Sequence, residues 1–149
     1  MMQRLTEEDR KSNNILHMAL CAGLLMMSGV IYYLISSGGV GINNSTNSTF
    51  FIIGSVVVLF GLLVSSKMYA ANIKHASSKT FDSYEDASAN FRSANVLRWA
   101  LIEGPSLVAV VLAFLEGNLF LFFPAMVGVL FLFLSKMNEE HFGNYRFGK

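Results

Sequence analysis

The sequence has 149 residues, of which 53% are hydrophobic and 14% charged, and its formal net charge at pH 7 is +1. With a mean hydropathy of +0.48, this composition excludes an ordinary soluble domain and is typical of an integral membrane protein. The near-zero charge excludes nucleic acid as a partner, because binding a phosphate backbone requires a dense basic surface. We therefore predict one all-α transmembrane domain over residues 1–149, built as a four-helix bundle.

The chain begins with a polar segment over residues 1–14, for which we predict a solvated tail. Thr6 and Asp9 form a weak capping-box pattern within it. The segment over residues 15–35 is continuously apolar, and about 20 such residues span a hydrocarbon core of about 30 Å. This run exceeds the apolar core of a signal peptide, so we predict the first transmembrane helix.

Small and aromatic residues mark two sides of this first helix. Ala19 and Gly23 stand four residues apart, a spacing that favours close packing of another helix. Tyr32 and Tyr33 are predicted to anchor the far end in the headgroup region. Cys21 is the only cysteine, which excludes an intrachain disulfide and a cysteine-based metal site, and we expect a buried, small hydrophobic side chain.

The second predicted helix covers residues 50–66, which are again apolar. Lys67 and Tyr69 follow it as predicted interface anchors, since lysine snorkels outward and tyrosine prefers the headgroup region. A small-residue stripe suited to packing against a neighbouring helix runs along this helix: Gly54, Gly61 and Ser65.

The polar segment over residues 67–95 is predicted to be a solvated connector with some helix. Its apolar residues recur at intervals that partly suit an amphipathic surface helix, which remains the alternative. The third helix is expected over residues 96–115 and the fourth over residues 119–134. The short link between them requires an antiparallel hairpin. Pro124 is predicted to bend the fourth helix, and residues 135–149 form a polar tail.

The eleven Lys and Arg residues are segregated along the chain. All lie in the N-terminal tail, in the central connector and its flanks, or in the C-terminal tail, whereas the two alternate loops contain none. By the positive-inside rule, this pattern predicts that both termini and the connector are cytoplasmic.

The third helix carries the residue with the strongest functional signal, Glu103. If the helix enters the membrane near residue 96, with Arg98 and Trp99 as interface anchors, Glu103 lies about 10 Å deep. A carboxyl group at that depth disfavours its charged form, so it seeks a proton, a cation or hydrogen-bond donors. Glu103 is therefore a candidate for proton or ion exchange.

Two groups near Glu103, a backbone carbonyl and a serine hydroxyl, complete the predicted ion-binding site. Pro105 kinks the helix and leaves the carbonyl group of Leu101 without its usual donor. Ser106 lies three residues after Glu103, on the same side of the helix. The carboxyl group, the freed carbonyl and the hydroxyl are expected to hold a proton, water or Na⁺. The alternative is a kink that a partner helix satisfies.

The segment from Ala100 to Leu115, A-L-I-E-G-P-S-L-V-A-V-V-L-A-F-L, resembles the carboxylate-bearing helix of the rotor-ring c subunits of ATP synthases. That resemblance implies that Glu103 corresponds to the ion-carrying carboxylate. As a whole, the chain is similar to small, uncharacterised four-helix inner-membrane proteins of bacteria, which implies a multi-pass protein of the bacterial inner membrane.

Two functions follow as expectations. The first is a noncatalytic helical subunit or accessory component of a larger membrane complex, whose partners are the lipid bilayer and other subunits or further copies of the chain. The alternative is an ion- or proton-coupled carrier or channel that uses Glu103. We expect no enzyme activity, metal or cofactor, because the sequence contains no recognisable catalytic or ligand-binding motif.

Overall fold

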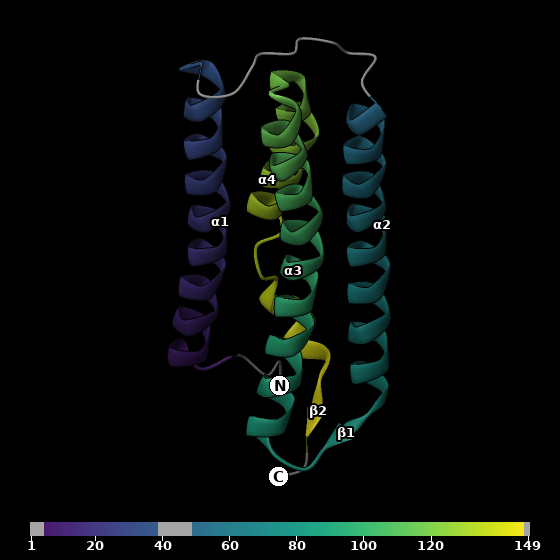
Figure 1. Ribbon diagram of the computed structural model, residues 1–149. Coiled ribbons are helices and arrows are strands. Elements are labelled where there is room, and N and C mark those ends of the chain that lie inside the picture. Colours follow the sequence, from purple (N-terminus) through teal and green to yellow (C-terminus); the bar gives the residue numbers. More distant parts are fainter. Residues whose placement is uncertain (1–4, 39–48, 148–149) are drawn as a thin grey trace.

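The computed structural model describes residues 5–38 and 49–147 (Figure 1). The described elements are α1 (Glu7–Ser36), α2 (Thr49–Ser78), β1 (Thr80–Phe81), α3 (Tyr84–Glu116), η1 (Leu119–Leu121), α4 (Phe122–Leu134), η2 (Glu139–Asn144) and β2 (Arg146–Phe147). Of these, α1, α2 and α3 are long and apolar enough to cross a membrane, and α4 is a shorter apolar helix. The prediction of a helical protein is confirmed, and three of its helices have the length and composition that a membrane span requires.

Helix α3 occupies the centre of the bundle and contacts α1, α2 and α4, with α1 and α2 on its two flanks (Figure 1). The predicted small-residue stripe of α2 makes one of these contacts. A Cβ atom built on Gly61 would lie 2.4 Å from Cγ of Pro105 and 2.8 Å from the carbonyl oxygen of Leu101. Gly54 and Ser65 are also buried. The stripe therefore lies in the described structure on the side of α2 that approaches α3.

The helices extend well beyond the predicted apolar segments. Helix α1 begins at Glu7, inside the predicted tail, because Thr6 caps it by accepting a hydrogen bond from the amide of Asp9. Helix α2 continues to Ser78 and α3 begins at Tyr84, so most of the predicted connector over residues 67–95 is helical. Hydropathy alone locates the membrane-spanning part of a helix and not its ends, because helical polar turns continue into water.

The hairpin between α3 and α4 has the predicted short link. Helix α3 ends at Glu116, and the capping residue Gly117 has a φ of 61°, in the left-handed region that glycine adopts at little cost. Asn118 then caps η1 by accepting a hydrogen bond from the amide of Phe120. Pro124 lies in the first turn of α4, where it removes no intrahelical hydrogen bond. The predicted bend at Pro124 is thus replaced by a regular helix start.

The predicted polar C-terminal tail folds back onto the ends of α1 and α3. Strand β2 pairs in parallel with β1, with Arg146 opposite Thr80, and η2 lies beside them. A cluster that we call the aromatic cap fills this end, with neighbouring ring centroids 5.4–5.7 Å apart. Its members are all buried: Phe81, Phe91, Phe142 and Tyr145. Consequently, both ends of the described chain lie at the same end of the bundle (Figure 1).

Candidate functional site: a polar file leading to Glu103

Glu103 lies on the side of α3 that faces α1. Its side chain is half-buried, and it lies one helical turn beyond Trp99, whose ring contacts His17 of α1. In the part of the chain that the structure describes, the Glu103 side chain forms no hydrogen bond or ion pair. Cys21 is buried, as predicted. The carboxyl group therefore lies on the α1 side of α3, and its oxygens accept no hydrogen bond from a described residue.

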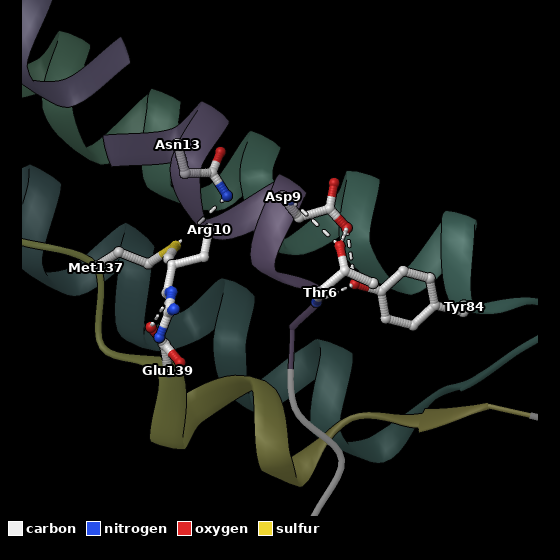
Figure 2. A network of polar contacts seen from close by, with 7 residues as sticks. All are labelled: Thr6, Asp9, Arg10, Asn13, Tyr84, Met137 and Glu139. Carbon is white, nitrogen blue, oxygen red and sulfur yellow. Dashed lines mark hydrogen bonds and ion pairs between the residues drawn. The ribbon is translucent and has the colours of Figure 1, made fainter. Parts of the chain in front are cut away.

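Helices α1 and α3 run in parallel, so their residues pair in successive layers. The outermost layer centres on Asp9 of α1 (Figure 2). Its carboxylate accepts hydrogen bonds from the Tyr84 hydroxyl at 2.7 Å, and from the hydroxyls of Ser88 and Thr6 at 3.0 Å each. The bond from Tyr84 is the main reason that the pKa of Asp9 falls below its usual value.

The second layer contains two buried asparagines, Asn13 on α1 and Asn95 on α3, which are only 2% and 0% exposed. Asn13 donates its amide to the Met137 sulfur at 3.4 Å (Figure 2), and Asn95 donates to the carbonyl of Phe91 at 2.9 Å. The side-chain oxygens of both are buried without a partner among the described residues. Each asparagine therefore keeps a side-chain acceptor that no described residue uses.

The third layer joins His17 of α1 to Trp99 of α3, whose ring centroids are 4.8 Å apart. His17 Nε2 lies 2.8 Å from the carbonyl oxygen of Leu132, so this nitrogen carries the hydrogen and donates it. The same nitrogen lies 3.9 Å from the Cys21 sulfur. Trp99 donates its indole N–H to the carbonyl of Ser135 at 2.8 Å. This layer attaches the end of α4 to α1 and α3.

Together these layers form a row that we call the polar file, which runs from the aromatic-cap end of the bundle to Glu103. Its α1 members recur every four residues and therefore share one face of the helix. The file consists of Asp9, Asn13, His17 and Cys21 on α1, and Ser88, Asn95, Trp99 and Glu103 on α3. On α1, the row thus places a polar side chain at each successive turn between the aromatic-cap end of the bundle and the level of Glu103.

Sequence reasoning missed Asn13 and Asn95 because each lies in a segment predicted to be solvated. The four-residue repeat from Asp9 through Asn13 and His17 to Cys21 is a signal that could have found the α1 half. This repeat becomes recognisable only if the first apolar helix is extended toward the N-terminus, beyond its predicted start at residue 15. The α3 half has a comparable spacing, because Ser88 and Asn95 stand seven residues apart and Trp99 and Glu103 follow at intervals of four.

The structure does not bring together the three groups predicted to bind an ion, which are the Glu103 carboxyl, the Leu101 carbonyl and the Ser106 hydroxyl. The carbonyl of Leu101 faces Gly61 of α2. The Ser106 hydroxyl donates to the carbonyl of Ile102 at 2.7 Å and lies against Gly128 of α4. Because Glu103 faces α1, the three predicted ligands point into three different helix contacts. The alternative, a proline site covered by a neighbouring helix, describes Leu101 and Pro105 correctly.

The predicted interface anchors divide into two groups. Trp99 is fully buried and Tyr69 is 7% exposed, so the prediction that they face the headgroups is wrong, and both are packing residues. Arg98 is half-buried over the Tyr69 ring. The other three are exposed, as an anchor requires, and their anchoring stays a prediction: Tyr32, Tyr33 and Lys67.

Ala19 and Gly23 are exposed, and a Cβ atom on Gly23 would meet no atom within 4 Å. These two residues therefore pack against none of the described helices, and their packing role stays a prediction. Among the described residues, no three His, Cys, Asp or Glu side chains are grouped to hold a metal ion. Comparison of the chain with protein-family models, curated proteins and solved structures finds no match.

Proposed function

We propose that the chain is a multi-pass membrane protein that crosses the bilayer four times, with both termini on the cytoplasmic side. Helix α4 has 13 residues and extends about 20 Å, and η1 adds about 6 Å before it. A slightly thinned bilayer accommodates such a span. The segregation of basic residues supports this orientation, and the resemblance noted above supports a location in the bacterial inner membrane.

We further propose that the chain acts as a noncatalytic helical subunit or accessory component of a larger membrane complex. The observation that carries this proposal is a contrast among glycines of the apolar helices. A Cβ atom built on any of three buried glycines would lie 3.3 Å or less from an atom of a neighbouring helix: Gly54, Gly61 and Gly128. A Cβ atom built on Gly23 or Gly104 would meet no atom within 4 Å. Glycine weakens a helix by about 0.5–1 kcal/mol relative to alanine, and close approach of a partner helix compensates for that cost.

The test is purification of the tagged protein from native membranes in a mild detergent. We expect stoichiometric partner chains or further copies of this chain. The variant Gly23→Leu should lose the partner, because its side chain blocks close helix approach. The exposed position Val30 offers a matched control, Val30→Leu, which should retain the partner. A monodisperse single chain in both the parent protein and the control would rule out this function.

A second candidate function is proton exchange at Glu103, and the polar file is the observation that favours it. In proteoliposomes, Glu103→Gln should abolish proton flux while folding is unchanged. Asn13→Leu should slow the flux, because it removes an acceptor from the second layer. Glu85 is exposed on the same helix, so Glu85→Gln is a matched control that should retain flux. Equal flux in the parent protein and in Glu103→Gln would eliminate proton exchange.

A further inference from the structure

The guanidinium group of Arg98 lies over the ring of Tyr69, with its central carbon 4.6 Å from the ring centroid. Its Nε atom is buried and has no hydrogen-bond partner among the described residues. No carboxylate in that part of the chain lies within ion-pair distance of it. The side chain as a whole is only half-buried, and its two terminal nitrogens are not among the buried atoms and have no partner among the described residues. These terminal donors on a permanent cation are therefore available to an oxygen acceptor from outside the described chain.

The Tyr69 ring holds this arginine in a fixed orientation, and His141 in turn holds Tyr69. The Tyr69 hydroxyl lies 3.1 Å from Nδ1 of His141, and the two rings are 5.7 Å apart. Tyr69 comes from α2, Arg98 from α3 and His141 from η2, so three separate elements converge here. Stacking on a ring fixes the plane of a guanidinium group, and its forked donors then suit the oxygens of a phosphate.

The level of Arg98 along the bundle identifies the source of that phosphate. The adjacent residue, Trp99, is hydrogen-bonded to Ser135, which directly follows the apolar helix α4. Arg98 therefore lies where the apolar spans end, at the depth of lipid headgroups. Leu134, at the same end of α4, is 71% exposed and offers an apolar surface for an acyl chain.

We infer that Arg98, with Tyr69 and His141, forms a binding site for the phosphate group of an anionic phospholipid. The arginine donates to the phosphate oxygens, Tyr69 holds the guanidinium plane, and the adjacent apolar surface of α4 contacts the lipid tail. This inference rests on the membrane location proposed above, but it depends neither on a partner subunit nor on Glu103.

Native mass spectrometry of the full-length protein, released from detergent after incubation with defined lipids, tests the site. The parent protein should retain phosphatidylglycerol in preference to phosphatidylcholine. Arg98→Gln should lower the apparent affinity for phosphatidylglycerol about tenfold, the loss expected for a charge-assisted hydrogen bond. Arg98→Lys keeps the charge but loses the forked donors, so its apparent affinity should lie between those of the parent protein and Arg98→Gln. This variant also provides the test if Arg98→Gln does not fold.

Arg92 supplies a matched control, because it is an exposed arginine of the same helix that contacts Ser12. Arg92→Gln should retain phosphatidylglycerol as the parent protein does. Equal retention by folded Arg98 variants and the parent protein would overturn the site. Equal retention of phosphatidylcholine would overturn the requirement for an anionic lipid. Displacement of phosphatidylglycerol by equimolar inorganic phosphate would overturn the lipid as the source of the phosphate.

Discussion

The contact between Gly61 and the proline turn of α3 leads to a sharp prediction for Gly61→Ala. The added Cβ atom would lie 2.4 Å from Cγ and 3.0 Å from Cβ of Pro105, and 2.8 Å from the carbonyl oxygen of Leu101. Carbon atoms pack best about 3.5–4.0 Å apart, so α2 and α3 must separate by about 1 Å. Neither the proline ring nor the carbonyl can turn away, because both belong to the rigid part of the helix.

This separation should lower the free energy of unfolding by about 1–3 kcal/mol, the usual cost of an overpacked core. Gly23→Ala is the matched control, because its Cβ atom meets nothing within 4 Å. That variant should be neutral or more stable by about 0.5–1 kcal/mol, since alanine favours the helix. The same substitution is thus expected to have opposite effects on two apolar helices.

The measurement is unfolding of purified protein in mixed micelles by increasing SDS, followed by far-ultraviolet circular dichroism. A double variant, Gly61→Ala with Pro105→Ala, adds a second check. Removing the proline ring should restore part of the loss and give a coupling free energy of about 1 kcal/mol. If Gly61→Ala and Gly23→Ala unfold at the same SDS fraction, the close contact between α2 and α3 does not exist as described.

The remaining predictions concern the cap end of the bundle. Asp9→Asn should lower the melting temperature at pH 7. Because hydrogen bonding depresses the folded-state pKa of Asp9 below 3.8, the difference from the parent protein should vanish as the pH falls through that folded-state pKa; a constant difference down to pH 2 would contradict it. Burial raises the pKa of Tyr145 from 10.0 to about 12, so its contribution to stability is complete below pH 10 and is lost as the pH rises toward about 12. The alkaline loss of stability should be smaller in Tyr145→Phe, and an unchanged alkaline melting curve would refute this. Trp99→Phe should cost about 1–3 kcal/mol in SDS unfolding, because it leaves the buried carbonyl of Ser135 unpaired; a loss below 0.5 kcal/mol would show that this bond is unimportant.

The apolar parts of the helices were predictable because hydrocarbon requires continuous apolar sequence of a certain length. The predicted ends at residues 35, 115 and 134 agree within one residue with the ends of α1, α3 and α4 at Ser36, Glu116 and Leu134. The stripe on α2 was predictable for a similar reason, since glycines seven residues apart share one helix face. The starts of α1 and α3 were not predictable from hydropathy, and neither was the end of α2, predicted at residue 66 and found at Ser78, because polar turns in water carry no hydropathy signal.

The candidate site shows the same division. Glu103 stands out in the sequence because an ionisable residue is rare in an apolar segment. Its neighbours could not be derived, because residues three or four apart on one helix need not face the same partner. Ser106 turns toward Gly128 of α4 and Glu103 toward α1.

The sequence by itself determined that the chain is helical and apolar enough to span a membrane, and it marked Glu103 and the α2 stripe. These properties depend on composition and on spacing within one segment. Only the tertiary structure decided which groups lie beside Glu103, because that depends on how α1 and α3 align. It likewise placed the aromatic cap and turned Trp99 from an expected anchor into a buried donor to Ser135, since burial is set by residues distant in the sequence.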